Sequence, residues 1–244
     1  MIRIVTNLIN KLINKMLKLF KKPIIIGKVY TISDLNTANN AFSLIDMKSK
    51  IRILIIDDEE FVYKEALREE NYNIKCIYNI DDLCAVSEYP IVICDIKGVG
   101  TNFSKEKEGA YVVSELKKKY PFKQIAVYSG LDYKLDSLND LDGIIRVKKD
   151  VSIDTWRESL NELIGRASDP KENWKTIRNF LLNNDVSIKD VLILESNFVD
   201  IYINRPNDLK YFPEDAILPK ISQDIKSIIQ NMIAGGLLQI ISNI

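Results

Sequence analysis

Residues 51–58 read Ile-Arg-Ile-Leu-Ile-Ile-Asp-Asp. An almost unbroken apolar run that ends in two acids is typical of a strand buried on both faces of a parallel sheet. Similar short apolar runs recur along the next hundred residues, each bounded by polar or turn-forming residues. We therefore expect five strands, at 51–56, 74–78, 91–94, 124–128 and 143–147.

Helical patterns separate these strands. They are predicted at 61–70, 80–87, 109–120, a weak segment near 133–138, and 153–163. Strict alternation of strand and helix predicts an α/β domain, a doubly wound five-stranded parallel sheet with crossover helices. We assign it residues 50–167, an ordinary length for one domain.

The carboxyl ends of four predicted strands carry the residues suited to chemistry: Asp57, Asp58, Asp95, Ser129, Lys148 and Lys149. Because parallel strands all point the same way, these residues are expected at one edge of the sheet. Three carboxylates there repel one another unless a cation lies among them, and oxygen ligands favour a hard ion such as Mg²⁺. Taken singly, each acid or lysine also fits a helix cap, a turn or a solvated strand end.

This pattern resembles the receiver domain of two-component response regulators, over about half of the chain. The matching stretches are ILIIDDEE (53–60), IVICD (91–95), EGAYVVSELKKKYP (108–121), IAVYSG (125–130) and DGIIRVKKD (142–150). The resemblance implies a flavodoxin-like receiver fold and a place in phosphorelay signal transduction. It also implies that a histidine kinase or phosphotransfer protein phosphorylates Asp95.

The same resemblance implies a role for each of the other site residues. Asp57 and Asp58 would bind Mg²⁺ together with Asp95 and the carbonyl of Lys97. The phosphoryl group would be met by a hydroxyl and an amine, supplied by Ser129 and Lys148, with Lys149 as a close alternative to Lys148.

Some features depart from the family. Residues 96–108 form a longer loop than usual, which would cover the site or form a partner surface, and no proline follows the lysine pair. No aromatic occurs at the usual switch position on the fifth strand, which is Ile145 if Lys148 is the family lysine. Tyr128, beside Ser129, is expected in the core.

Residues 1–49 are assigned to a basic amphipathic helix and a connector. Seven Lys or Arg residues and no acid occur between positions 1 and 28, and apolar residues recur with helical spacing over 2–20. Lysines interrupt the apolar run too often for a membrane span, and no signal-peptide cleavage site follows. Two interpretations remain, packing on this protein or a partner, and binding of residues 1–22 to an anionic membrane surface.

Residues 168–244 are expected to be helical, with patterns starting at Trp174, over 186–202 and over 221–241. This region is interpreted as a small output domain that binds a protein partner, or as an element that forms a homo-oligomer. DNA binding is not expected, because the candidate recognition helix carries Asp190, Glu195 and Asp200 against Lys189 alone.

The composition limits the remaining functions. The chain has no histidine, no net charge and three cysteines without metal-site spacing, which is consistent with a reduced, cytoplasmic bacterial protein. The favoured function is an atypical, non-enzymatic response regulator that switches protein–protein binding. The alternatives are a phosphorylation-independent pseudo-receiver in a larger assembly, of a membrane-associated or defence-related kind, and a phosphatase that uses carboxylates and Mg²⁺.

Overall fold

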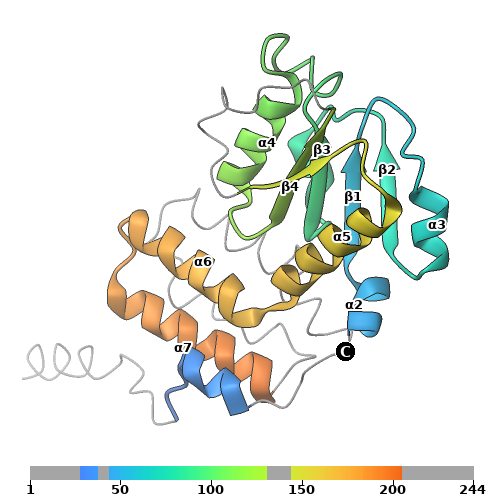
Figure 1. Cartoon of the computed structure of the whole chain (residues 1–244). Coiled ribbons are helices and arrows are strands. Elements are labelled where there is room, and N and C mark those ends of the chain that lie inside the picture. The colour runs from blue at the N-terminus through green and yellow to red at the C-terminus, as the bar shows by residue number, and fades with distance from the viewer. Residues whose placement is uncertain (1–27, 38–43, 131–143, 205–244) are drawn as a thin grey trace, which may run out of the picture.

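The computed structural model describes residues 28–37, 44–130 and 144–204. Five parallel strands form one sheet in the order β2-β1-β3-β4-β5 (Figure 1). The strands are β1 (Arg52–Ile56), β2 (Asn73–Ile77), β3 (Ile91–Asp95), β4 (Gln124–Ser129) and β5 (Ile145–Lys148). This is the doubly wound, flavodoxin-like order that receiver domains share, so the predicted fold class is confirmed.

The helices of the described residues follow the predicted sequence of elements with different bounds. They are η1 (Ile32–Thr37), α2 (Leu44–Lys50), α3 (Lys64–Glu69), η2 (Leu83–Val86), α4 (Glu108–Lys119), α5 (Ile153–Ser168), α6 (Pro170–Asn183) and α7 (Ile188–Asn204). The helix predicted at 80–87 is only a short 3₁₀ helix, Leu83–Val86. It begins after Asp82, whose side chain accepts the N–H of Cys84 and so forms its N-cap. The helix predicted at 153–163 runs five residues further, since Ile164 and Ala167 extend its buried face.

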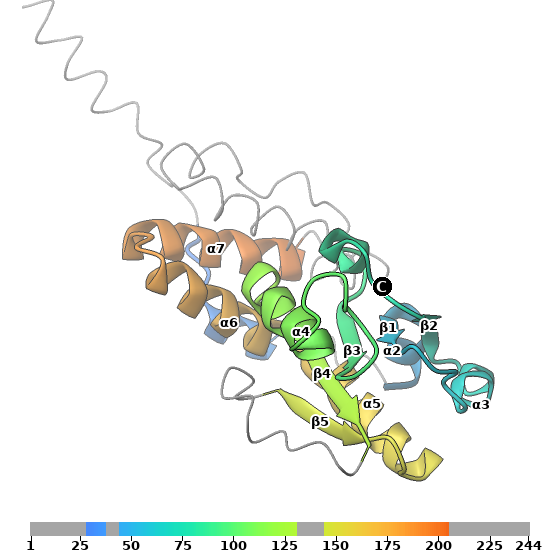
Figure 2. The ribbon, with the colours of Figure 1, turned by 90° about the horizontal axis from the view of Figure 1, so that it is seen from above.

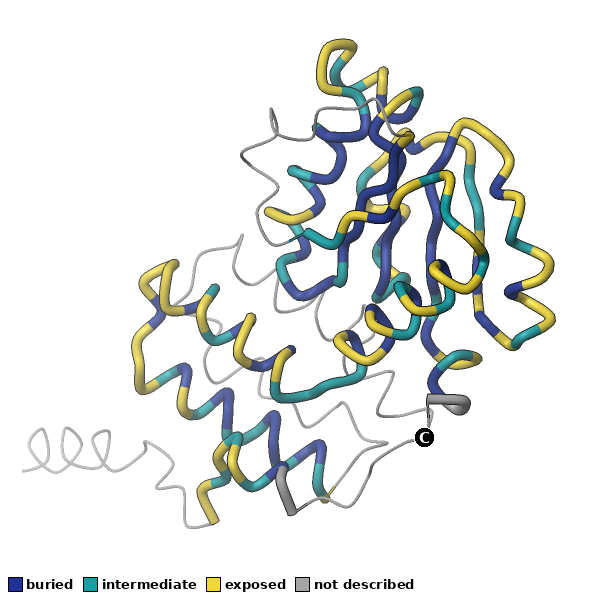
Figure 3. The backbone as a smooth tube through the Cα atoms, in the orientation of Figure 1, coloured by how far each residue is buried: buried dark blue, intermediate teal, exposed yellow. Residues whose placement is uncertain are grey.

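Two separate cores cover the two faces of the sheet. Alternate residues of each strand point to opposite faces, so that Ile53 and Ile55 join one core while Leu54 and Ile56 join the other. Helix α5 lies on the first face and α4 on the second, as the view from above shows (Figure 2). Strand β3 is buried throughout and β1 is buried after its first residue, whereas the helices alternate buried and exposed residues (Figure 3).

Helices α6 and α7 form a hairpin whose buried side belongs to the same core as α4. Trp174 of α6 stacks on Phe198 of α7, with ring centroids 5.1 Å apart. Its indole N–H donates to the buried carboxylate of Glu195, at 2.7 Å. The same carboxylate accepts the backbone N–H of Ile32 at 3.1 Å, so residues 28–37 form a strap bound across the hairpin.

A single residue separates α5 from α6. Asp169 ends α5 and caps α6, accepting the N–H of Lys171 at 2.8 Å, and Pro170 follows it at the first helical position, where its missing N–H costs nothing. The Asn173 side chain donates to the carbonyl of Ala167 at 2.7 Å. The hairpin is therefore fastened directly to the end of α5.

The helices expected at 2–20, 133–138 and 221–241 lie outside the described residues. Within the described part of the chain, no helix combines the length and the apolar character that crossing a membrane requires.

Candidate functional site

Three carboxylates gather at the carboxyl ends of neighbouring strands. Asp57 and Asp58 follow β1, and Asp95 is the last residue of β3, whose Cys94 pairs with Ile56 of β1. One oxygen from each carboxylate lies within 4.8 Å of the others. Asp57 and Asp95 are buried and Asp58 is exposed, so the cluster opens to solvent on one side. The structure thus brings together the three acids that the sequence predicted at one edge.

A lysine already holds this cluster together. The Nζ of Lys149 lies 2.6 Å from Asp95 Oδ2 and 3.2 Å from Asp57 Oδ1, and 3.5 Å from Glu59 Oε2. Burial disfavours the charge of Lys149, but its contacts with Asp95 and Asp57 hold its pKa above the ordinary lysine value. Lys149 is therefore a fixed positive charge between the two buried acids.

The structure places Lys149, and not Lys148, beside Asp95. Side chains alternate along β5, and Val147 points to the α5 core on the face that Asp57 and Asp95 also share. Lys148 falls on the opposite face and is exposed. The N–H of Lys149 donates to the carbonyl of Ser129 at 3.0 Å, so the β4–β5 pairing continues one residue beyond Lys148. The Lys149 side chain therefore lies on the same face as Val147 and the acids.

Tyr128 contributes a contact that the sequence reasoning missed. Its ring is buried in the α5 core, as expected, but its hydroxyl donates to Asp57 Oδ2. The other oxygen of Asp57 accepts the N–H of Glu59 at 3.1 Å, besides Lys149. Burial raises the pKa of Asp57, and these donors oppose the rise. Alternation along β4 places Tyr128 on the face of Asp57, which was the available signal.

Lys97 and Ser129 lie at the ends of the two strands β3 and β4, which pair side by side. The N–H of Lys97 donates to Asp95 Oδ1 at 3.3 Å, so the backbone of Lys97 runs past the cluster. Ser129 ends β4 and is mostly buried, and its hydroxyl lies 3.4 Å from the carbonyl of Gly130.

The long loop after Asp95 is packed against the site. Gly98 has φ +74°, a left-handed conformation that favours glycine, and a Cβ there would overlap the carboxylate of Asp58. Its N–H donates to Glu108 Oε2 at 2.9 Å. A Cβ on Gly109 would in turn overlap the carbonyl of Asp95. The loop therefore fits closely around two of the three acids.

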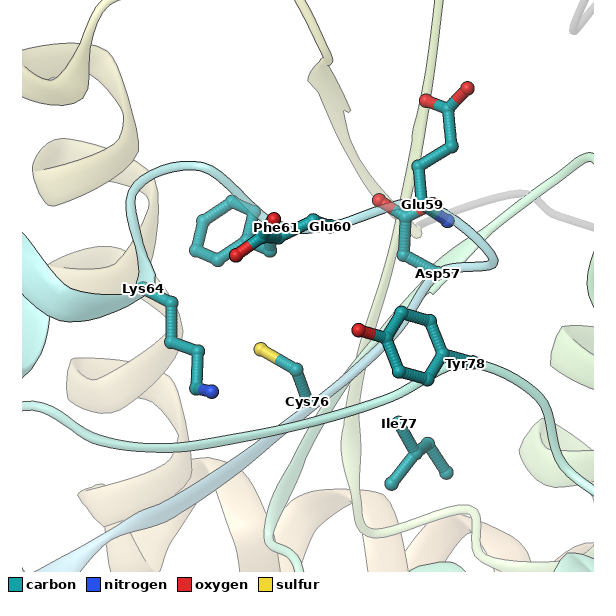
Figure 4. A pocket seen from close by; sticks show the side chains of 8 residues that line it. All are labelled: Asp57, Glu59, Glu60, Phe61, Lys64, Cys76, Ile77 and Tyr78. Carbon is teal, nitrogen blue, oxygen red and sulfur yellow. Dashed lines mark hydrogen bonds between the residues drawn. The ribbon is translucent and has the colours of Figure 1, made fainter.

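A pocket of about 100 Å³ opens beside Asp57 on the side of β2. Its walls come from the loop after β1, from α3 and from the end of β2 (Figure 4): Asp57, Glu59, Glu60, Phe61, Lys64, Cys76, Ile77 and Tyr78. In Figure 4 the Cys76 thiol points into the space between Lys64 and Tyr78. Burial raises the pKa of Cys76, so that this thiol stays protonated at neutral pH.

Comparison with known proteins adds resemblances of fold. No protein-family model matches the chain, and no curated protein matches its sequence. Among solved structures it is similar to a CheY-like response regulator receiver domain protein from Methanospirillum hungatei JF-1, with 22% identity and a TM-score of 0.41 over 49% of this chain and 97% of that chain.

Two larger structures show a similar likeness. NtrX from Brucella abortus, solved in complex with ATP, has 16% identity and a TM-score of 0.40 over 54% of this chain and 34% of that one. Full-length FixJ from B. japonicum has 13% identity and a TM-score of 0.41 over 80% of this chain and 95% of that one. The strand order is that of the flavodoxin-like doubly wound fold, and the three acids lie at the carboxyl ends of its strands.

Proposed function

We propose that this chain is an atypical response regulator, in which Asp95 accepts a phosphoryl group with the help of Mg²⁺. The observation that carries the proposal is the cluster of Asp57, Asp58 and Asp95, in which Lys149 contacts the two buried acids, Asp57 and Asp95. Buried carboxylates are costly to keep without an opposing charge. A site of this kind at the carboxyl edge of a doubly wound sheet is where such folds bind their ligands.

The donor set suits magnesium. Asp57, Asp58 and Asp95 offer carboxylate oxygens, and Lys97, whose N–H contacts Asp95, is proposed to add its backbone carbonyl. Hard oxygen donors with an open, solvent-facing side are the usual surroundings of Mg²⁺, which keeps several waters. When bound, the ion would supply charge neutralisation for the phosphoryl oxygens.

Asp95 is the proposed acceptor because it lies in the middle of the sheet and contacts the lysine most closely. In the transfer, a carboxylate oxygen of Asp95 forms a bond to phosphorus while the bond from phosphorus to a histidine nitrogen of the donor protein breaks. The released imidazole keeps the electron pair and takes a proton from solvent. Lys149 then pairs with the phosphoryl charge, and Ser129, one residue beyond the β4 partner of Asp95, donates its hydroxyl.

Access to Asp95 requires Lys149 to move. The Asp95 side chain is only 3% exposed, whereas that of Lys149 is 21% exposed and lies over it. An incoming phosphoryl group would therefore displace the Lys149 ammonium from Asp95 Oδ2. The ammonium would then bind the phosphoryl oxygens. This exchange of partners converts phosphorylation into a local movement at the end of β5.

The proposed output is a change in protein–protein binding through the C-terminal helical region. The hairpin is joined to the end of α5 by one residue and shares the core of α4, so it contacts elements from both faces of the sheet. The partners would be a histidine kinase or phosphotransfer protein at the acids, and a second protein at the helices. We assign the chain no catalytic activity beyond its own phosphorylation and dephosphorylation, and we place it in the cytoplasm, with an anionic membrane surface as a further contact of residues 1–22.

Beryllofluoride tests the proposal, because with Mg²⁺ it mimics an aspartyl phosphate. We expect beryllofluoride and Mg²⁺ together to shift the amide spectrum or the oligomeric state of the full chain. The shift should disappear in Asp95→Asn and persist in Lys148→Met, which alters an exposed neighbour. A wild-type chain that binds Mg²⁺ but ignores beryllofluoride would contradict phosphorylation at Asp95.

A second function, the phosphorylation-independent pseudo-receiver, has one observation in its favour. Lys149 and Tyr128 already contact Asp57 and Asp95, so both buried acids of the site have partners within the protein. Such a site would hold its shape without a cation. Absence of any Mg²⁺ binding by calorimetry would favour this alternative.

A further inference from the structure

Tyr128 contacts the acidic site with one end and the α5 core with the other. Its hydroxyl donates to Asp57 Oδ2, and the ammonium of Lys149 lies 5.2 Å from the centre of its ring. The ring edge meets the indole of Trp156 on α5, with centroids 5.6 Å apart and planes at 78°. One side chain thus touches two charged groups of the site and the largest buried residue of α5.

The hydroxyl fixes the direction in which Asp57 points. Asp57 Oδ1 is occupied by the N–H of Glu59 and by Lys149, and Oδ2 by Tyr128. Each carboxylate oxygen has two lone pairs, so the two donors fill those of Oδ1, and Oδ2 retains one for a cation. Because three donors from three segments hold the carboxylate, it cannot turn toward a new ligand without moving at least one of them.

A closed path of contacts runs from the site through α5 and back. Trp156 meets Tyr128 on one side and Phe61 on the other, at 4.9 Å and 71°. Phe61 lies in the loop that follows Asp57 and Asp58 and lines the pocket beside Asp57. Among the described residues, the buried indole N–H of Trp156 has no hydrogen-bond partner. The position of this indole is therefore set by the two rings and not by a polar anchor.

We propose that Tyr128 is a positioning residue that orients Asp57 for the cation and transmits occupation of the site to Trp156 of α5. The inference rests on the proposed binding of Mg²⁺ by the three acids. Strand β5, Ile-Arg-Val-Lys, contains no aromatic residue, so it offers no phenol hydroxyl and no ring at the site. The aromatic link from the site to α5 instead comes from β4.

Fluorine NMR on the full chain labelled with 5-fluorotryptophan tests this link. The sequence holds two tryptophans, so Trp156 reports on α5 and Trp174, in the hairpin, reports whether each variant is folded. In the wild type, Mg²⁺ should shift the Trp156 resonance. In Tyr128→Phe, we expect this shift to fall by at least half at saturating Mg²⁺, and the Mg²⁺ affinity, measured by calorimetry, to weaken roughly tenfold.

Tyr72→Phe is the matched control. Tyr72 is equally buried in the same core, and its hydroxyl also bonds to α5, donating to Asn161 at 2.7 Å, but it does not touch the acids. We expect this variant to keep the wild-type shift and affinity. Mg²⁺ binding with the full Trp156 shift in Tyr128→Phe would overturn the inference alone. A wild type that gives no heat with Mg²⁺ would overturn the proposed metal site, and the inference with it.

Discussion

Removing the ammonium of Lys149 should destabilise the protein in a way that Mg²⁺ repairs. Lys149→Met keeps the length and most of the apolar stem of the side chain but deletes the charge between Asp95 and Asp57. The two buried carboxylates then face each other and Asp58 without a cation. We expect the free energy of unfolding to fall in the absence of divalent ions and to recover in part when Mg²⁺ is added.

The magnitude follows from burial and contact. Breaking a buried ion pair by removing one partner costs about 3–5 kcal/mol, because the other charge is left buried and unpaired. Here the lysine contacts Asp95 at 2.6 Å and Asp57 at 3.2 Å, but its side chain is 21% exposed, so water can replace part of the lost contact. We therefore expect a loss of about 2–3 kcal/mol, a large part of the 5–15 kcal/mol by which domains are usually stable.

Urea unfolding with and without Mg²⁺ measures both effects. Lys148→Met is the matched control, since Lys148 is the adjacent residue and is exposed. It should change the free energy of unfolding by no more than about 0.5 kcal/mol. Equal losses in the two variants, or a loss in Lys149→Met that Mg²⁺ leaves unchanged, would refute the assignment of Lys149 as the cation of this site.

Three further predictions concern other parts of the chain. Burial lowers the pKa of Lys123 from 10.5 to about 7, so the unfolded chain binds more protons than the folded chain between these pH values. The free energy of unfolding should therefore rise with pH in this range, by up to about 1.4 kcal/mol per pH unit. Urea unfolding at several pH values should show this rise in the wild type and not in Lys123→Met. Gly98→Ala should weaken Mg²⁺ binding in calorimetry and cost about 1–2 kcal/mol in stability, because alanine is strained at φ +74° and its Cβ overlaps Asp58. Glu195→Ala should cost about 2–5 kcal/mol in urea unfolding and speed proteolysis of residues 28–37, because the indole N–H of Trp174 and a strap N–H lose their buried acceptor.

Each of these variants has a control at an open position. Lys75→Met alters an exposed lysine on β2 and should leave the pH dependence of stability unchanged. Gly165→Ala adds a Cβ in open space on α5 and should stabilise the helix. Glu172→Ala removes an exposed acid of α6 and should have little effect on unfolding or proteolysis. If the effect of a control variant is as large as that of the test variant it accompanies, the contact assigned to the residue changed in the test variant is wrong.

The parallel sheet was predictable because its pattern is both local and repeated. The inner strands β1, β3 and β4 are short apolar runs that are buried on both faces, and that burial leaves a continuous signature in the sequence. Strand ends were harder, because β3 and β4 each extend by one residue into Asp95 and Ser129. A polar residue that serves the site ends the apolar pattern before the backbone pairing ends.

The contacts within the site were less predictable than the residues that form it. The choice between Lys148 and Lys149 depends on a one-residue register, which reverses the face of every side chain. The role of the Tyr128 hydroxyl was missed because an aromatic residue beside apolar neighbours indicates core packing. Here the ring packs in the core and the hydroxyl also bonds to Asp57. The buried acceptor Glu195 was counted only as a negative charge, since nothing in a helical pattern says that a carboxylate will meet two donors from distant segments.

The arrangement of α5 and α6 gives the site a mechanical route to the hairpin. Asp169 is at once the last cap of α5 and the first cap of α6, and the Asn173 side chain bonds back to the carbonyl of Ala167. A shift of α5 must therefore carry the start of α6 with it or break a buried hydrogen bond. Trp156 lies in the first turn of α5, and Asp169 directly follows the last residue of the same helix. We therefore expect a movement that begins at the acids to reach the hairpin through α5. The strap of residues 28–37, held on α7 by Glu195, lies at the far end of that route.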